Sequence, residues 1–187
     1  MKWIARTYYM ADIGSFIREY SSFKSTFKIT SFDDANNVSL CNDESQEVIN
    51  FDKIIETNYP NSNDRPKSFD ALYIHDNNIY CIEFKNLKPA SIENDDVKGK
   101  LEAGKRALEE LLSAQNIQKN DYNFIYCVCY KHCTEPRDRY KCGIAKGAIQ
   151  FDLEQYKEKQ VIKEVFTNNV TFFTKQFQKK TQQSLLC

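Results

Sequence analysis

The sequence is poor in residues that interrupt regular structure, and it has no long apolar run. Of 187 residues only 5 are glycine and 4 are proline, while 41% are hydrophobic and 28% are charged. This composition excludes fibrous and disordered chains and predicts one folded domain over 1–187. No apolar run approaches the roughly 18 residues of a membrane span, and Met1 to Arg6 lack the apolar stretch of a signal peptide. We therefore expect a cytoplasmic protein without a membrane segment.

The formal net charge is zero, because 26 Lys and Arg residues balance 26 Asp and Glu residues. Global charge therefore does not indicate a polyanion partner, although a local basic strip opposite an acidic site would average to zero. The sequence has no glycine-rich phosphate loop, which argues against an ATP-driven function. Its two histidines, His75 and His132, do not stand where a nucleophile and base pair would need them.

Seven cysteines lie at positions 41, 81, 127, 129, 133, 142 and 187. An odd number in a chain without an export signal predicts reduced thiols or metal ligands rather than a disulfide framework. Cys127, Cys129, Cys133 and Cys142 could together bind Zn²⁺ or an iron–sulfur cluster. Their spacing does not match a paired CxxC motif, and Cys127 and Cys129 fall in a predicted strand, where cysteine is often a small hydrophobe. Burial is therefore the favoured interpretation for those two.

Hydrophobic periodicity predicts an α/β fold, a mixed sheet of four or five strands flanked by helices. The helical patterns cover 13–27, about 48–55, 92–113 and, as a basic tail, 155–180. The predicted strands are 69–74, 79–85, 122–130 and 148–153. The third of these strands is apolar on both faces, which is typical of an interior strand.

The first two of these strands, 69–74 and 79–85, should form a hairpin that brings charged residues together. If the turn centres on Asp76 and Asn77, Asp70 lies opposite Glu83, with Cβ atoms roughly 5 Å apart. Alternation places Lys85 on the face of Glu83 and turns Ile82 and Phe84 toward the core. A turn centred one residue later would set Asp70 opposite Lys85 but would keep all three on that face.

Paired carboxylates repel unless a cation lies between them, and their hard oxygens suit Mg²⁺ or Mn²⁺. A divalent ion there can activate water and stabilise charge on a phosphate, while a lysine orients the water or holds the phosphate. The pattern thus favours phosphodiester hydrolysis. The alternative is a solvated structural pair, but Glu83 and Lys85 interrupt an otherwise apolar strand, where burial alone would not place charge.

The segment Ser68-Phe69-Asp70, a hairpin, and Ile82-Glu83-Phe84-Lys85, followed by an amphipathic helix and an apolar strand, resembles the PD-(D/E)xK nuclease superfamily. The resemblance implies a restriction-endonuclease-like αβββαβ core over about 45–153, with helical segments at 1–44 and 154–187. It implies metal ligation by Asp70, Glu83 and the Phe84 carbonyl, and catalysis by Lys85. Some members add an acid from the preceding helix, for which Glu56 is the first candidate here and Glu47 the second.

We therefore expect a metal-dependent nuclease that acts as a DNA endonuclease. Restriction enzymes commonly act as dimers, so the resemblance also implies a homodimer. Candidate phosphate contacts are Lys67, Lys98, Lys100, Lys105, Arg137, Arg139 and Lys141. Two alternatives remain. One is a catalytically silent subunit of the same fold that binds DNA or supports an assembly. The other is an exonuclease with an iron–sulfur cluster, in which Cys41 would join the later cysteines, although the helix after Lys85 lacks the QxxxY motif of that group.

Overall fold

The computed structural model describes residues 12–132 and 149–187. Its strands are β1 (Lys24–Thr26), β2 (Phe32–Asp33), β3 (Val38–Ser39), β4 (Glu47–Asn50), β5 (Ala71–His75), β6 (Asn78–Lys85), β7 (Asn123–Tyr130) and β8 (Glu164–Asn169). Its α-helices are α1 (Ile13–Glu19), α2 (Phe27–Thr30), α3 (Phe51–Asn58), α4 (Asn94–Ala114), α6 (Glu154–Glu158) and α7 (Val170–Thr181). Short 3₁₀ turns are η1 (Ser21–Phe23), η2 (Pro89–Ser91) and η3 (Lys119–Asp121).

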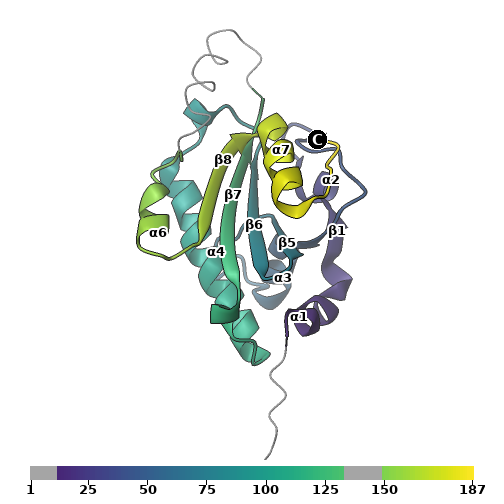
Figure 1. The fold of residues 1–187 in the computed structure, drawn as a ribbon, viewed down its shortest axis with the longest axis vertical. Coiled ribbons are helices and arrows are strands. Elements are labelled where there is room, and N and C mark those ends of the chain that lie inside the picture. The colour runs from purple at the N-terminus through teal and green to yellow at the C-terminus, as the bar shows by residue number, and fades with distance from the viewer. Residues whose placement is uncertain (1–11, 133–148) are drawn as a thin grey trace, which may run out of the picture.

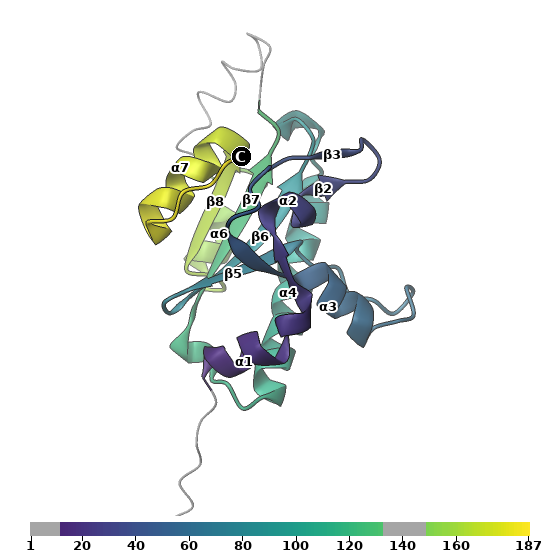
Figure 2. The ribbon, with the colours of Figure 1, turned by 90° about the vertical axis from the view of Figure 1, so that its right-hand side faces the viewer.

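Six strands form one mixed sheet in the order β1-β4-β5-β6-β7-β8, and β2 and β3 form a separate pair. The pairings from β1 to β6 are antiparallel, whereas β6, β7 and β8 run parallel (Figure 1). Helix α4 lies on one face of the sheet, and α2 and α7 lie on the other (Figures 1 and 2). The predicted α/β class with flanking helices is confirmed, but the main sheet has six strands rather than four or five.

The β5–β6 hairpin has the predicted register. His75 pairs with Asn78 and Ala71 with Ile82, so the two-residue turn is Asp76-Asn77, and Asp76 has a φ of 51°. Asp and Asn tolerate this left-handed conformation better than most side chains, which favours a tight turn here. The strand register therefore carries Asp70 toward Glu83.

Two apolar cores fill the space on either side of the sheet. On the α4 side, Leu101 and Leu108 pack in one cluster with Leu72 and Tyr126 of the strands. On the α7 side, the rings of Phe27, Tyr73, Phe84, Phe173 and Phe177 pack together at centroid distances of 4.7–6.3 Å. Strand β7 contributes to both clusters, so the prediction that it lies in the sheet interior is confirmed.

The predicted helix over 13–27 is wrong beyond Glu19. The chain makes η1 and then β1, which pairs with β4 through Lys24 and Ile49. The serines at 21 and 22 favour turns over helix interiors, and Thr26 caps a new helix by accepting a hydrogen bond from the Ile29 N–H. The 1–44 segment is therefore not simply helical in its described part, 12–44.

The predicted helix over 48–55 begins later than expected. Residues 47–50 form β4, and Asn50 caps α3 by accepting from the Lys53 N–H at 3.0 Å. Val48 and Ile49 are β-branched and face opposite cores, so they fit a strand buried on both faces. Periodicity alone did not separate these four residues from the helix that follows them.

The expectations for the end of the chain are also partly wrong. In the described part of 148–153 there is no strand: Phe151 and Asp152 have φ angles of 63° and 54° and form a turn. The supposed helical tail over 154–187 contains β8, which pairs in parallel with β7. Its residues Val165 and Phe166 face opposite cores, so a sheet accommodates them on both sides.

The cysteine expectation needs correction as well, because Cys41 and Cys187 form a disulfide. Cys81, Cys127 and Cys129 are free and buried. Burial raises the pKa of each of these thiols and keeps it protonated, as in a small apolar residue. Cys133 and Cys142 lie outside the described residues, so the four-cysteine metal site stays untested.

None of the helices in the described ranges is long and apolar enough to cross a membrane.

Two glycines of α4 should respond oppositely to alanine. A Cβ on Gly104 would lie 2.7 Å from Cε1 of Phe69, whose buried ring stacks on Phe51, whereas a Cβ on Gly99 would first meet the flexible Lys67 chain at 3.4 Å. We expect Gly104→Ala to cost about 1–3 kcal/mol through overpacking and Gly99→Ala to gain about 0.5–1 kcal/mol from helix propensity. Urea unfolding measures the change in unfolding free energy for both variants. A Gly104→Ala protein more stable than the wild type would contradict the close approach of α4 to Phe69.

Candidate active site

Asp70 and Glu83, the two predicted metal ligands, lie side by side at the end of the hairpin. The Asp70 N–H donates to the Ile82 carbonyl at 3.0 Å, and Asp70 Oδ2 accepts from the Phe84 N–H at 2.5 Å. The Asp70 carboxylate therefore lies against the segment that carries Glu83. As predicted, Glu83 faces away from Ile82 and Phe84, which belong to the core on the α7 side. The sequence did not predict that α4 covers the face that carries Glu83.

An ammonium group from α4 lies between these two carboxylates. Lys100 Nζ is 2.7 Å from Glu83 Oε1 and 3.6 Å from Asp70 Oδ1. The sequence suggested Lys100 as a phosphate contact, but its side chain is 22% exposed and points into the molecule. Its spacing of three and four residues from the buried Val97 and Gly104 is the signal that could have placed it on the inner face of the helix.

Lys85 connects the carboxylate pair to a further acid on α4. Lys85 Nζ is 2.9 Å from Glu83 Oε1 and donates to Asp96 Oδ2 at 2.7 Å. Asp96 Oδ1 accepts from Lys67 at 2.8 Å. Burial opposes ionisation of Asp96, but the hydrogen bonds from the two lysines overcome it and hold its pKa at about 2. Asp96 was not predicted, although it stands four residues before Lys100 and hence on the same helix face.

We call Asp70, Glu83, Lys85, Asp96 and Lys100 the charged cluster. Glu83 has no exposed surface, and burial raises its pKa despite the nearby charges of Lys100 and Lys85. Burial likewise raises the pKa of Asp70, and the Glu83 charge adds to the effect. Among the described residues no donor makes a hydrogen bond of regular geometry with either Glu83 oxygen. Glu83 Oε1 lies 2.7 Å from Lys100 Nζ and 2.9 Å from Lys85 Nζ, so another cation at this oxygen has to compete with these two ammonium groups.

A third acid near the pair is Asp52 in the first turn of α3, which sequence reasoning missed. The Ser68 hydroxyl donates to Asp52 Oδ1. After burial and Glu83, the charge of Asp52 is a further cause of the raised pKa of Asp70. An acid that caps the first helical turn is common in any helix, so the sequence alone gave no reason to single it out.

The acids suggested from the preceding helix have other partners. Glu56 lies one turn beyond Asp52 on α3 and pairs with Lys53 at 2.7 Å and with Arg65 at 3.3 Å. Glu47 lies in β4, not in a helix, and pairs with Lys24 at 2.7 Å. Neither carboxylate belongs to the charged cluster.

A groove of about 490 Å³, the acidic groove, opens beside the charged cluster. Asp70, Phe84 and Lys85 contribute to its lining, and Ile29, Phe32 and Leu87 add exposed apolar side chains. The acids in its lining, Asp33, Asp34, Asp52, Glu56 and Asp70, outnumber its two lysines, Lys53 and Lys85. Such a lining attracts a cation and repels an unaccompanied phosphate chain.

The remaining predicted phosphate contacts are not gathered at this groove. Lys98 pairs with Asp152 at 3.0 Å, and Lys105 pairs with Glu109 further along α4. Lys67 contacts the charged cluster through Asp96. Arg137, Arg139 and Lys141 lie outside the described residues.

The groups that could hold a divalent metal are the Asp70 and Glu83 carboxylates and a main-chain carbonyl. The Lys85 carbonyl accepts from the Lys131 N–H on the β7 side. Strand alternation therefore turns the preceding carbonyl, that of Phe84, toward Asp70. In the described ranges no group of three His, Cys, Asp or Glu side chains is arranged to hold a metal ion. The buried, incompletely bonded Glu83 fits a hard cation, provided that the Lys100 ammonium is displaced.

Comparisons of the chain with models of protein families, with curated proteins and with solved structures each find no match.

Proposed function

We propose that this protein is a metal-dependent nuclease that cuts DNA internally, with a PD-(D/E)xK-type site on a restriction-endonuclease-like sheet. The convergence of Asp70, Glu83 and Lys85 beside an open groove carries the proposal. The Lys85 ammonium lies 2.9 Å from a fully buried Glu83, and a buried charged pair of this kind costs free energy that a purely structural strand would avoid. The antiparallel hairpin followed by α4 and the parallel β7 also supports the proposed core.

In this proposal each residue of the charged cluster except Lys100 has a role. Asp70, Glu83 and the Phe84 carbonyl would hold Mg²⁺ or Mn²⁺. When bound, the ion would activate water and offset the charge that develops on the phosphate. Lys85, which lines the acidic groove, would orient the attacking water or hold a phosphate oxygen. Asp96 would fix the Lys85 ammonium through its 2.7 Å hydrogen bond.

The test is incubation of the protein with circular single-stranded and circular duplex DNA, in Mg²⁺, in Mn²⁺ and in EDTA. We expect metal-dependent cutting that falls at least about 100-fold in Asp70→Asn and in Lys85→Ala, because each loses charge stabilisation of the transition state. Lys179→Ala, which removes an exposed lysine from α7 on the other face of the sheet, is the matched control and should retain activity. Cutting that survives in EDTA or in both site variants would refute the assignment.

The position of Lys100 favours a second candidate, the catalytically silent subunit. An ammonium 2.7 Å from Glu83 and 3.6 Å from Asp70 can neutralise the pair without any metal. In that case the charged cluster would be structural, and the protein would bind nucleic acid or a partner without cutting. Isothermal titration with Mn²⁺ separates the two: the nuclease binds the ion at Asp70, and the silent subunit does not. If circles are not cut, a linear substrate tests for an exonuclease.

A further inference from the structure

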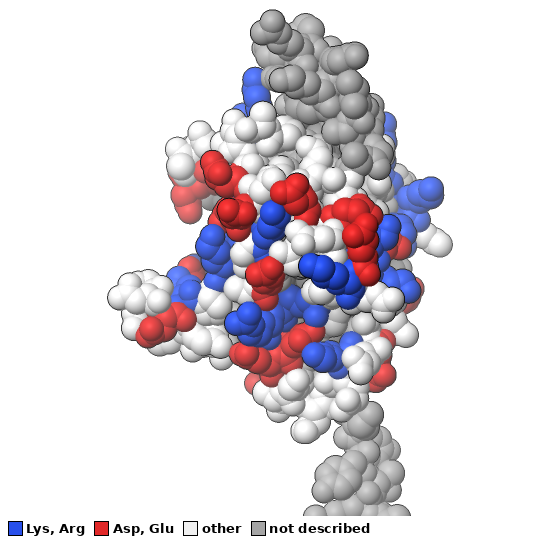
Figure 3. Space-filling model, turned by 90° about the vertical axis from the view of Figure 1, so that its left-hand side faces the viewer, with Lys and Arg blue, Asp and Glu red and all other residues white. Residues whose placement is uncertain are grey.

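A second groove, remote from the acidic groove, is rich in lysine. Its volume is about 890 Å³, and it is lined by the C-terminal half of α4, by η3 and the start of β7, and by the turn between α6 and β8. Its charged side chains are Lys105, Glu109, Lys119, Lys157, Lys159 and Lys163, which is five lysines against one acid. We call it the lysine groove. Basic side chains gather among acidic ones on the face that carries α4 and α6 (Figure 3).

The single acid does not neutralise the lysine groove. Glu109 contacts both Lys105 and Lys119, the latter at 2.9 Å. Lys157 and Lys163 are exposed and have no acidic partner among the described residues, and Lys159 contacts only the neutral Gln155 at 3.4 Å. Three ammonium groups are therefore available to an outside anion.

An ordered turn presents these three lysines. Gln160 has a φ of 56°, and its N–H donates to the Lys157 carbonyl at 2.9 Å. The Lys163 N–H donates to the Phe124 carbonyl at 2.8 Å, which fixes the turn to β7. A fixed backbone lowers the entropy lost when a ligand is bound.

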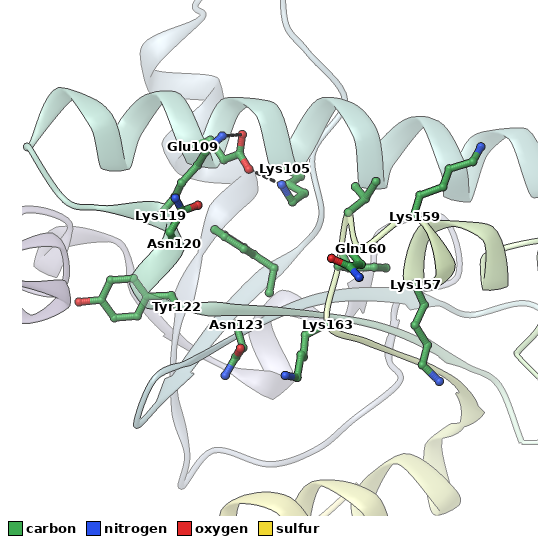
Figure 4. A pocket seen from close by; sticks show the side chains of 13 residues that line it. Lys105, Glu109, Lys119, Asn120, Tyr122, Asn123, Lys157, Lys159, Gln160 and Lys163 are labelled. Carbon is green, nitrogen blue, oxygen red and sulfur yellow. Dashed lines mark hydrogen bonds and ion pairs between the residues drawn. The ribbon is translucent and has the colours of Figure 1, made fainter.

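The arrangement of the lysines indicates an extended ligand. Figure 4 shows the labelled lysine ends spread apart, with those of Lys157 and Lys159 pointing in opposite directions, rather than converging on one point. A single phosphate needs convergent donors, whereas a polyphosphate chain is held by charges along its length. Asn120, Asn123 and Gln160 add neutral amides that can bond to sugars or bases.

We infer that the lysine groove binds the sugar–phosphate backbone of a nucleic acid. The inference deepens the proposed nuclease function, on which it rests for the choice of nucleic acid over another polyanion. It supplies the phosphate affinity that the acidic groove lacks. Lys100 of the charged cluster and Glu109 of the lysine groove are ~14 Å apart along α4, at 1.5 Å per residue. That length of helix corresponds to about four base pairs at 3.4 Å each.

The experiment measures binding without metal, so it does not depend on cleavage. Fluorescence anisotropy of a labelled duplex oligonucleotide is recorded in EDTA over a series of salt concentrations. The test variant is Lys157→Gln/Lys163→Gln. The control is Lys175→Gln/Lys179→Gln, which removes the same charge from exposed positions on α7, on the other face of the sheet.

We expect the test variant to bind the duplex at least about tenfold more weakly at low salt. The slope of log K against log salt concentration should become shallower by about 1.8, since each phosphate contact contributes about 0.9. The control should change affinity by less than about twofold. Equal losses of affinity in both variants would show that binding depends on diffuse charge, and would overturn the assignment of the lysine groove. Unchanged binding in the test variant would also overturn it. So would a protein that binds polyglutamate but not DNA. If the wild type binds the duplex but does not cut DNA in Mg²⁺ or Mn²⁺, the result would instead count against the proposed nuclease and leave the groove standing.

Discussion

Lys100→Met is expected to lower the free energy of unfolding by about 3 kcal/mol in the absence of divalent metal. The substitution keeps an unbranched apolar side chain, one atom shorter than that of lysine, and removes the ammonium 2.7 Å from the fully buried Glu83. Lys85 would be the closest remaining cation, at 2.9 Å, and Asp70 would lose the ammonium at 3.6 Å. Breaking a buried ion pair costs several kcal/mol because the remaining charge stays desolvated. Urea unfolding in EDTA measures the loss.

The same variant tests whether the cavity between the carboxylates accepts a metal. If it does, Mn²⁺ should restore stability in Lys100→Met by about 2.7 kcal/mol at a hundredfold excess over its dissociation constant. The wild type should respond less, because its own ammonium competes for the carboxylates. Lys98→Met is the matched control, since Lys98 lies on the same helix but pairs with the exposed Asp152, and it should lose no more than about 1 kcal/mol. A Lys100→Met protein that unfolds like the wild type would contradict the bridging role.

Removing the Cys41–Cys187 disulfide is expected to cost about 2–5 kcal/mol, because the bond closes a loop with a sequence separation of 146. In the unfolded chain such a cross-link removes more entropy than a short one does. The bond also holds the last residues near a buried acid: Asp43 Oδ2 accepts from the Leu186 N–H at 2.8 Å. Without the covalent link this hydrogen bond must be formed at the full entropic cost of ordering the end of the chain.

Thermal unfolding with and without dithiothreitol, in the wild type and in Cys41→Ser/Cys187→Ser, measures this contribution. The reductant should destabilise the wild type to the level of the variant and leave the variant unchanged. Cys81, Cys127 and Cys129 are buried thiols, so the reductant has no other disulfide to act on among the described residues. Equal stability of the oxidised and reduced wild type would show that the link does not constrain the unfolded chain.

Local patterns were sufficient for the hairpin and for α4. The turn residues at 76 and 77 set the register of β5 and β6, and alternation along β6 separated Glu83 from the core residues Ile82 and Phe84. Helix α4 has a single apolar stripe, so its period is unambiguous. In these elements the interactions that decide the structure are between residues close in sequence.

The sequence was less informative where partners are distant. Strand β8 was taken for helix because it is buried on both faces, and only its pairing with β7 defines it. Lys100 was predicted to contact phosphate and Asp96 was not singled out, since nothing local shows that the helix stripe beside Val97 would face two carboxylates from the sheet. The disulfide joins residues that are 146 positions apart, and cysteine counting cannot show that.

The contact of Gly104 with Phe69 also determines how far α4 stands from the sheet. An added Cβ would lie 2.7 Å from the ring, so the missing side chain lets the helix approach closely at that point. Lys100 lies one turn before this contact and Lys105 directly after it. A helix is stiff over so short a distance, and lifting it by part of an ångström would shorten the reach of both lysines together. One hydrogen atom in place of a methyl group thus sets the positions of two lysines at once, Lys100 in the charged cluster and Lys105 in the lysine groove.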